Sequence, residues 1–329
     1  MRVFVTGGTG AIGSHTVPAL IAAGHEVTAM ARSDAKAAVL ISQGARPIRV
    51  SLFDRNALTK AFHGHDAVVN MASALPSPQR FLLQSAWAAC ERIRTEGSAT
   101  VVDAALAAAV PRVVQESVVM IYHDGADRWL DEDSAVDHYP IASGNHAAES
   151  SARRFAETGG DAVILRFGQF YGPGAAHSEQ IMDLARHHVA FQAGRRDSYM
   201  SSIYLPDAAS AVVAALTCPA GTYNVVDDEP VTKKQHTQAL AEAVGAKPWI
   251  AGPGRLALLL GDRTTSMTRS LRVSNARFRA DAGWAPRYPS VREGYRAMVA
   301  GPLRDSACAS HFGKISHFLT RCGCDSRGR

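Results

Sequence analysis

The sequence predicts an α/β protein, built as a doubly wound parallel sheet with a smaller C-terminal lobe. Three observations support this prediction. Short apolar runs alternate with helical patterns through the first half of the chain, a glycine-rich turn follows the first apolar run, and the rhythm changes near residue 172. Strands that alternate with helices at this spacing form βαβ units, whose strands are parallel.

The N-terminal half contains the alternating elements. The first run, RVFVTG at residues 2–7, has the continuous hydrophobicity of a buried parallel strand. Residues 12–24 have apolar side chains at helical spacing and end at Gly24, and Pro18 is expected to kink this helix. Further strands are expected at residues 25–32, 46–54, 65–73, 111–122 and 161–174, and further helices at 56–64, 96–110 and 146–160.

The C-terminal half follows a less regular pattern. Asp207 is expected to cap a helix that follows a short strand, and Gly245 to end another. The expected elements are a helix at 177–191, a strand and helix within 201–216, a strand within 221–232, a helix at 233–245 and a final helix before residue 300. We therefore expect a larger domain at 1–171, a smaller lobe at 172–300 with segments that return to the sheet, and a poorly ordered tail at 301–329.

Composition excludes several classes of protein. The chain has 329 residues, 47% of them hydrophobic and 20% charged, with a formal net charge of +5. Lys and Arg are scattered rather than massed, so no nucleic-acid partner is expected. We expect no signal peptide, because an apolar strand pattern begins at Arg2, and no apolar run reaches the ~18 residues of a membrane span. These features favour a cytoplasmic protein with a small-molecule substrate.

The five cysteines do not form a disulfide framework. Cys90 and Cys218 lie in apolar or Ala-rich surroundings and are expected in the core. Cys308, Cys322 and Cys324 fall in the tail, and their spacing lacks the second pair that a zinc site needs. We expect no metal site.

The glycine-rich turn, TGGTGAIG at residues 6–13, is the strongest functional motif. Gly7 permits a tight turn, Gly10 lets the backbone approach a phosphate, and Gly13 lets the following helix pack closely. The helix N-terminus supplies N–H groups and partial positive charge to an anion. Because the motif opens a βαβ series, it predicts a Rossmann-type NAD(P)-binding domain over residues 1–171.

The end of the second strand bears on the choice of dinucleotide. NAD-binding domains commonly place a carboxylate there for the ribose hydroxyls. This chain has Ala31, Arg32 and Ser33 instead. Since an arginine can pair with the 2′-phosphate, the sequence favours NADP and leaves NAD as the alternative.

Several motifs together resemble the extended short-chain dehydrogenase/reductase superfamily, in particular its NAD(P)-dependent epimerase/dehydratase family. The resemblance covers roughly residues 1–300. The motifs are TGGTGAIG (6–13), DAVVNMAS (66–73), EGSATVVDAA (96–105), VILRFGQFYGPG (163–174), SSIYLPDAASAV (201–212), GTYNVVDDEPVT (221–232) and GWAPRYPSVREGY (283–295).

The resemblance implies a set of cofactor contacts and allows a homodimer. Leu52 and Ser51 would lie by the adenine, although the family usually has Asp at the position of Ser51. The implied cofactor-binding residues are Thr6, Gly7, Gly10, Ala11, Ile12, Gly13, Arg32, Leu52, Met71, Ala72, Ser73, Phe167 and Gly168.

The family's catalytic pair is missing. Its members use a Tyr followed four residues later by a Lys, whose charge lowers the phenol pKa. Four residues after Tyr139 stands Ser143, and counting back from Glu149, which resembles the family's helix Glu, gives Asn145 and Ile141. No lysine occurs between Lys60 and Lys233, so no shift of alignment restores the pair.

Two residues are the candidate catalytic groups. Ser117 lies near the position of the serine that orients a carbonyl, although the usual alignment puts Val118 there. Tyr139 precedes the helix and could supply a proton. The remaining candidates, each with packing or surface roles as the alternative, are Tyr122, His138 and His146.

The diphosphate-binding arginine of the nucleotide-sugar enzymes is also replaced, by Met200, although Arg195 and Arg196 lie nearby. Two hypotheses follow. The first is an oxidoreductase or epimerase-like enzyme that moves a hydride on a small carbonyl, alcohol or sugar-type substrate. The second is a catalytically weak NAD(P)-binding sensor or regulatory protein. The second lobe favours the first hypothesis, and the missing lysine favours the second.

Overall fold

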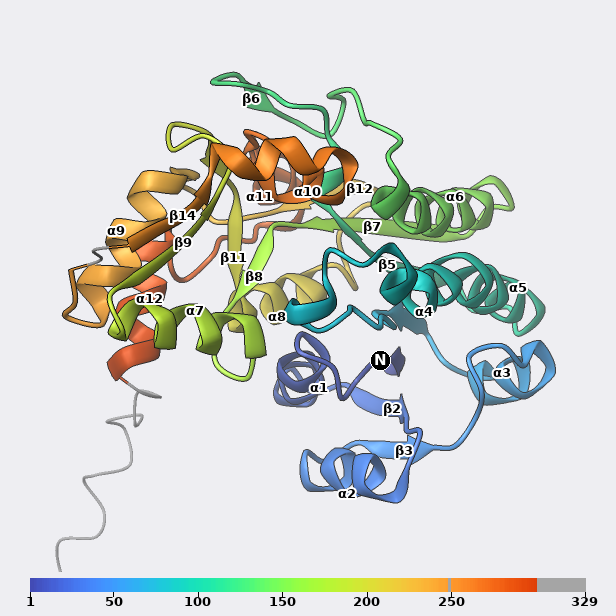
Figure 1. Cartoon of the computed structure of the whole chain (residues 1–329). Helices are drawn as coiled ribbons and strands as arrows, with labels where there is room; N and C mark the ends of the chain where they lie inside the picture. Colours follow the sequence, from blue (N-terminus) through green and yellow to red (C-terminus); the bar gives the residue numbers. More distant parts are fainter. Residues whose placement is uncertain (248–249, 301–329) are drawn as a thin grey trace, which may run out of the picture.

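A seven-stranded parallel sheet forms the centre of the molecule (Figure 1). The computed structural model describes residues 1–247 and 250–300. The strands of this sheet are β1 (Arg2–Thr6), β2 (Glu26–Met30), β3 (Arg46–Ile48), β4 (Ala67–Asn70), β5 (Arg112–Val118), β7 (Asp161–Phe167) and β12 (Gly221–Val225), in the order β12-β7-β5-β4-β1-β2-β3. The predicted fold class is confirmed, and β12 from the C-terminal half forms one edge.

Helices cover both faces of this sheet. The helices are α1 (Gly13–Ala22), α2 (Asp34–Ser42), α3 (Arg55–Phe62), α4 (Ala88–Arg92), α5 (Ser98–Ala107), α6 (Ser143–Glu157), α7 (Ala176–Arg186), α8 (Leu205–Ala214), α9 (Lys233–Ala243), α10 (Thr265–Thr268), α11 (Ala276–Ala282) and α12 (Val291–Ala300). One apolar core joins α1, α2 and α8 to one face, and another joins α3, α5 and α6 to the other face. Both faces of the strands are therefore buried, which explains their continuous apolar runs.

Short strand pairs organise the C-terminal lobe. They are β8 (Gln169–Tyr171) with β11 (Ser202–Tyr204), β9 (Val189–Ala193) with β14 (Ile250–Gly254), and β10 (Tyr199–Met200) with β13 (Val231–Thr232). The smallest pair is β6 (Trp129–Leu130) with β15 (Arg272–Val273). A third core, which includes Tyr171, Tyr204 and Tyr295, joins these strands to α7, α9 and α12.

The structure differs from the expected elements at several places, of which three bear on the predictions above. Helix α2 lies in a segment with no predicted element, and its N-terminus is capped by the hydroxyl of Ser33. The expected helix at 177–191 ends at Arg186 and is followed by β9. Asp207 is not the helix cap, because Tyr204 holds that position and the Asp207 carboxylate instead accepts a hydrogen bond from the Tyr288 amide at 3.0 Å.

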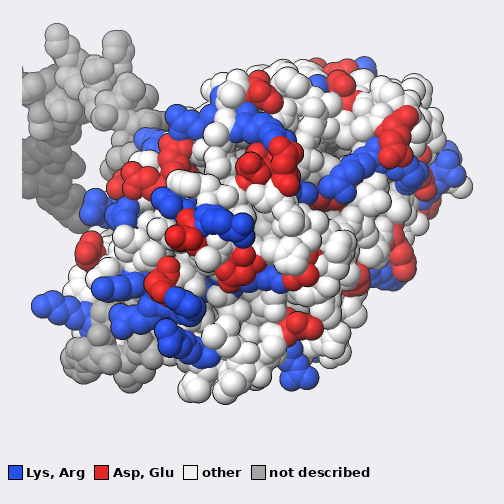
Figure 2. Space-filling model, turned by 90° about the horizontal axis from the view of Figure 1, so that it is seen from above, with Lys and Arg blue, Asp and Glu red and all other residues white. Residues whose placement is uncertain are grey.

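Other expectations concern cysteines, the surface and the tail. Cys90 and Cys218 are buried free thiols, as predicted. Lys and Arg side chains lie among Asp and Glu side chains over most of the face in Figure 2. Within residues 1–247 and 250–300, no helix has the length and apolarity to cross a bilayer. The predicted tail, 301–329, with its three cysteines, lies outside the described residues.

Candidate active site

The glycine turn lies at the carboxyl end of β1 and packs against the end of β4. Gly7 has a φ of +70°, and a Cβ there would lie 2.4 Å from the carbonyl oxygen of Met71. A Cβ at Gly13 would lie 2.2 Å from the carbonyl oxygen of Gly7, and one at Gly10 would lie 3.2 Å from the same oxygen. Side chains are therefore excluded at Gly7 and Gly13 by neighbouring backbone, which keeps the turn open to a ligand.

The turn leads directly into α1, where the amides of Ser14 and His15 already donate to the carbonyl oxygens of Gly10 and Ile12. Ile12 is the N-cap residue, and no side chain caps the helix. The chain passes from β1 to β2 and β3 on one side of the sheet, and then to β4 and β5 on the other. The turn therefore lies at the point where the strand order reverses, which is where open α/β sheets bind nucleotides. These residues fit a dinucleotide pyrophosphate.

Buried polar side chains fix the strand ends beside this turn. The Thr6 hydroxyl donates to Asn70 Oδ1 at 2.6 Å, and Asn70 Nδ2 donates to Gln115 Oε1 at 2.8 Å. These bonds connect β1, β4 and β5 in one layer. Met71 is buried beside the turn, and Ser73 Oγ lies 3.7 Å from the sulfur of Cys90.

Two cations flank the turn at the end of β2. Arg32 is exposed, and Lys36 on α2 directs its Nζ to the carbonyl oxygen of Thr9 at 3.5 Å. The nearest carboxylate in the sequence, Asp34, pairs with Arg49. The surface beside the turn is therefore suited to an anionic group such as a 2′-phosphate.

The predicted adenine contacts lie further along the same edge. Leu52 is buried, and a Cβ on Gly97 would lie 2.6 Å from its Cδ2 atom. Ser51 is exposed, and its hydroxyl accepts from the Phe53 amide at 3.2 Å. The guanidinium of Arg92 lies over the Phe53 ring, 4.2 Å from its centroid. Leu52 can therefore form an apolar floor, and Ser51 offers a hydroxyl rather than the family's carboxylate.

The last predicted cofactor contacts, Phe167 and Gly168, lie at the carboxyl end of β7. Phe167 is fully buried, and a Cβ on Gly168 would lie 2.9 Å from the carbonyl oxygen of Ser201. Glycine at position 168 therefore lets the chain pass close to the start of β11.

Ser117 belongs to a buried ionic network. Its hydroxyl donates to Glu149 Oε1 at 2.7 Å, and Arg166 donates to both oxygens of the same carboxylate at 2.8 Å. Arg166 also donates to the Tyr122 hydroxyl, which donates to Asn224. Burial by itself raises the pKa of Glu149, but the bonds and charge of Arg166 outweigh it and lower the net pKa. The network holds β5, α6, β7 and β12 together.

The Tyr139 hydroxyl is also engaged in a hydrogen bond. It donates to the carbonyl oxygen of Met120 at 2.9 Å, and the Arg269 guanidinium lies over its ring, 4.7 Å from the centroid. Burial raises the Tyr139 pKa to about 12, against the opposing charge of Arg269. The structure thus places Ser117 and Tyr139 in separate hydrogen-bonded settings, and their catalytic roles stay predictions.

The remaining candidates also have partners. The rings of His138 and His146 stack with centroids 4.1 Å apart, and His146 Nε2 lies 2.9 Å from the carbonyl oxygen of Asp137. Arg195 forms an ion pair with Asp197 at 2.7 Å. These contacts match the packing and surface alternatives.

Counted back from Glu149, the positions of the missing pair are Ile141 and Asn145; counted from Tyr139, they are Tyr139 and Ser143. Ile141 borders a recess whose lining combines Phe81, Trp87 and Leu260 with the charged Asp262 and Arg263. Asn145 is buried, and within the described part of the chain its Oδ1 has no hydrogen-bond partner. A buried oxygen without a partner is uncommon in folded proteins.

Arg94, a buried cation beside Gly144, is neutralised by an ion pair with Glu116. Arg94 has its Cβ 3.0 Å from where a Cβ on Gly144 would lie, and it donates to Glu116 at 2.9 Å. Both side chains of this ion pair are 6% exposed. The charge of Arg94 is therefore balanced by Glu116.

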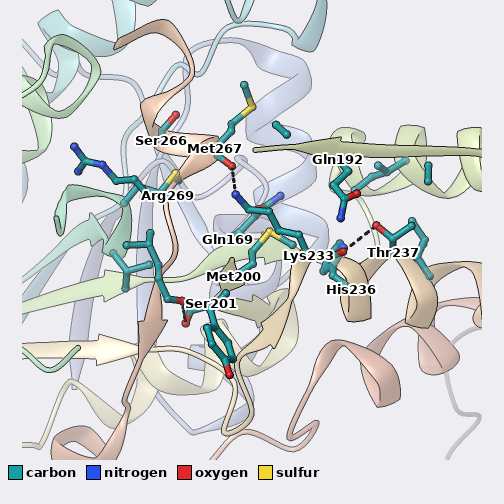
Figure 3. Close-up of a pocket in the computed structure, with 18 of the residues that line it drawn as sticks. Gln169, Gln192, Met200, Ser201, Lys233, His236, Thr237, Ser266, Met267 and Arg269 are labelled. Atoms are coloured by element: carbon teal, nitrogen blue, oxygen red, sulfur yellow. Dashed lines mark hydrogen bonds between the residues drawn. The ribbon is translucent and has the colours of Figure 1, made fainter. Parts of the chain in front are cut away.

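A cavity opens between the strand ends and the C-terminal lobe (Figure 3). Val119, Met120 and Gln169 border it from the ends of β5 and β7, and Met200 borders it from β10. Its volume is about 100 Å³, which is of the order that accepts one small ring. Its other lining residues include Ile181, Ala190, Gln192, Tyr199, Lys233, His236, Leu240, Ser266, Met267, Arg269 and Leu271.

Sequence reasoning did not find Gln192, Lys233 or Ser266 as site residues. Lys233 opens α9, where Thr232 and Gln235 form a capping box, so the sequence presents it as a residue of the first helical turn. Lone polar residues in a lobe of irregular pattern carry no motif. Only the packing of β9, α9 and α10 around one space brings them together.

This chain matches one relative over nearly the whole length of that relative. The chain is 33% identical over 311 residues, 89% of this chain and 99% of the relative, to the 3-diazoavenalumate denitrifying reductase of a Streptomyces species. A shorter region, 34% of this chain and 39% of the relative, is 36% identical over 113 residues to an L-arabinose 1-dehydrogenase (NAD(P)(+)) of Haloferax volcanii.

Solved structures share the fold. The Thermus thermophilus UDP-glucose 4-epimerase, in complex with NAD, has a TM-score of 0.75 and 24% identity over 91% of this chain and 98% of that one. The human epimerase family protein SDR39U1 with NADPH has a TM-score of 0.78 and 22% identity over 92% of this chain and 100% of that one. Residues 3–225 match the NAD dependent epimerase/dehydratase family, and the chain therefore belongs to that family.

Proposed function

We propose that this protein is an NADPH-dependent reductase that adds hydride to a small electrophile whose reduction needs no proton from the enzyme. The observation that carries the proposal is the pair Ile141 and Asn145, at the positions where the family's Tyr and Lys would stand. The glycine turn, and the N-terminus of α1 that no side chain caps, support dinucleotide binding. When bound, the dinucleotide supplies the hydride.

NADP is the preferred form in this proposal. Arg32 and Lys36 present two cations beside the turn, and Asp34 is engaged by Arg49. The 2′-phosphate of NADP would find two partners there, whereas the ribose hydroxyls of NAD would find no free carboxylate in residues 31–33.

Carbonyl reduction is disfavoured by the groups that remain. It leaves an alkoxide, so the enzyme must deliver a proton to oxygen as hydride reaches carbon. Ser117 donates its proton to Glu149, and Tyr139 donates to a backbone carbonyl with its pKa raised to about 12. Asn145 carries no proton that it can release near neutral pH.

An arene diazonium ion is the electrophile that these residues suit. Its aryl carbon gains the hydride with its electron pair, and the C–N bonding pair leaves with dinitrogen. Hydride cancels the single positive charge of the ion, so no proton is taken up. The Streptomyces relative, a denitrifying reductase named for a diazo compound, supports this choice.

The electrostatics around Asn145 agree with a cationic substrate. An ammonium at this position would repel a diazonium ion, whereas the Asn145 amide carries no net charge. The neighbouring Arg94 is already paired with Glu116. Loss of the family lysine therefore removes a repulsion in addition to an acid-base group.

A substrate panel tests the proposal. The protein with NADPH is given 4-carboxybenzenediazonium, aromatic aldehydes, ketones and UDP-glucose, and NADPH oxidation is followed together with released dinitrogen. We expect one dinitrogen and one benzoate for each NADPH consumed with the diazonium ion, at a rate well above the protein-free mixture. Faster turnover of an aldehyde, a ketone or UDP-glucose would refute the choice of electrophile.

The second hypothesis, an NAD(P)-binding sensor, is supported by the hydrogen bonds of the Ser117 and Tyr139 hydroxyls. Because each hydroxyl donates its proton to another protein group, neither is free to donate it to a substrate. It predicts tight NADPH binding with no turnover of any compound in the same panel. The panel therefore separates the two hypotheses directly.

A further inference from the structure

We propose that the cavity beside α9 binds an anionic group of the substrate, a carboxylate, through the ammonium of Lys233, in a lining that also holds the unpartnered polar groups of Gln192 and Ser266. This inference rests on the proposed reductase function, because it concerns the far end of the same substrate. It also makes predictions about binding that do not require turnover.

Lys233 is a buried cation without an ion-pair partner among the described residues, although the charge of Asp124 acts on it. Its residue is 6% exposed, and its Nζ donates to the carbonyl oxygen of Met267 at 2.7 Å (Figure 3). Within residues 1–247 and 250–300 it forms no ion pair, although the ammonium has three protons to donate. A buried ammonium normally has a charged partner, so this one is suited to an anion that arrives with the substrate.

Two further donors line the same cavity. Gln192 on β9 is 6% exposed, and its Nε2 has no acceptor within the described part of the chain. Ser266 on α10 has a buried Oγ that likewise lacks a partner among the described residues. Figure 3 shows both with Lys233 in the lining of the cavity. Unpartnered groups of this kind indicate a ligand that completes their hydrogen bonds.

The other charged or titratable lining groups are already engaged. Arg269 pairs with Asp137 and donates to the carbonyl oxygen of Tyr122. His236 Nε2 lies 2.9 Å from the hydroxyl of Tyr295. Among the described residues, the lining contains no carboxylate, and Asp124, outside the lining, is the carboxylate whose charge acts on Lys233.

The remaining walls define the rest of the ligand. They are mostly apolar and run from Leu240 and Met267 to Val119 and Met120 at the end of β5. A flat apolar body would therefore extend from the carboxylate at Lys233 toward the strand ends where the cofactor groove begins. The substrate would carry its cationic reacting group at one end and its anion at the other, which fixes its orientation.

Binding of cinnamate and of cinnamamide tests the site without any reaction. The two probes share shape and differ in charge, and each is titrated calorimetrically into the protein saturated with NADP+. We expect wild type to bind cinnamate about tenfold or more tightly than cinnamamide, since a charge-assisted hydrogen bond is lost in the amide. Lys233→Met should bring the two affinities together, and the matched control Lys234→Met, on an exposed neighbour, should not.

A pH titration of the wild type gives a second measurement that needs no variant. Burial lowers the Lys233 pKa to about 8, against the opposing charge of Asp124. At pH values where cinnamate is ionised, its affinity should therefore fall as the pH rises through about 8, while cinnamamide affinity stays constant. His236, with its pKa lowered by burial to about 4, stays neutral over this range, and Arg269 and Tyr199 complete the charged or titratable lining.

The outcomes separate this inference from the proposed reaction. Equal affinities of wild type for cinnamate and cinnamamide, at every pH, would overturn the anion site even if 4-carboxybenzenediazonium were reduced. A cinnamate preference that depends on Lys233 would support the site even if no diazonium compound were turned over, in which case only the proposed reaction would fail.

Discussion

The glycine turn gives the prediction whose magnitude follows most directly from the structure. A Cβ at Gly13 would lie 2.2 Å from the Gly7 carbonyl oxygen and 2.7 Å from two backbone atoms of Gly8, well inside the 3.0 Å that Cβ atoms keep from other heavy atoms. Backbone cannot rotate away as a side chain can, so Gly13→Ala must displace the start of α1. We expect a loss of about 3 kcal/mol in the free energy of unfolding, the upper end for overpacking.

The affinity of Gly13→Ala for NADPH should fall together with its stability, because the displaced residues are those that would hold the pyrophosphate. An increase of at least about tenfold in the Kd for NADPH, or about 1.4 kcal/mol, is expected. Substitutions at Gly8 and Gly252 serve as comparisons for Gly13→Ala. A Cβ on Gly8 meets only side chains, the nearest being Val17 at 3.2 Å, and a Cβ on Gly252 meets nothing within 4 Å. We expect Gly8→Ala to cost about 1 kcal/mol and Gly252→Ala less than about 0.5 kcal/mol.

Thermal unfolding and NADPH titration of the three variants provide the assay. The structure requires the order Gly13, then Gly8, then Gly252, from most to least damaging, in both measurements. A Gly13→Ala protein that melts and binds NADPH like Gly252→Ala would refute the steric reasoning.

The remaining predictions concern cofactor choice, the buried network and the catalytic positions. Arg32→Ala should raise the Kd for NADPH about tenfold, measured by fluorescence titration, and leave the Kd for NADH unchanged. Glu149→Gln should cost about 3 kcal/mol in chemical denaturation, because it leaves the buried Arg166 without its counter-charge. Since the folded-state pKa of Glu149 is lowered from its ordinary 4.5, this cost should be full above pH 4.5 and shrink as the pH falls below it. The double variant Ile141→Tyr/Asn145→Lys should reduce 4-carboxybenzenediazonium at least about tenfold more slowly and gain aldehyde reduction, measured by NADPH oxidation.

Each of these predictions has a matched control. Lys60→Ala removes an exposed cation of α3 and should leave the NADPH affinity unchanged. Arg153→Ala removes the half-exposed partner of Glu149 and should cost less than about 1 kcal/mol. Ser117→Ala removes one neutral donor from Glu149, so about 1 kcal/mol of stability should be lost while turnover persists. A collapse of turnover in Ser117→Ala with unchanged stability would restore that hydroxyl as the catalytic group.

The parallel sheet and the glycine turn could be predicted from the sequence because both depend on local patterns. The buried strands are continuous apolar runs, and the turn is a fixed spacing of glycines at the end of one of them. Helix α2 has no such pattern, since Leu40 is its one buried residue and its other side chains face solvent. Its N-terminus is marked only by the cap of Ser33.

The cavity beside α9 could not be predicted, because its polar residues come from distant segments. Gln192 directly follows the range expected for a helix, and Asp207 has the residue type of a cap without holding that position. In the structure, β9 pairs with β14 and Asp207 holds the Tyr288 amide, contacts across 61 residues or more that no local pattern encodes. In the sequence Lys233 is only the next lysine after Lys60, and tertiary packing makes it a buried cation.

The origin of the hydrogen in the product tests the central claim most directly, namely that hydride transfer proceeds without a proton from the enzyme. NADPH deuterated at the 4R or the 4S position is reacted with 4-carboxybenzenediazonium in H2O, and unlabelled NADPH in D2O, and the benzoate is examined by mass spectrometry. We predict deuterium at the former C–N carbon from one of the two labelled cofactors, none from the other, and none from D2O. Deuterium from D2O, or equal transfer from both labelled cofactors, would contradict this account.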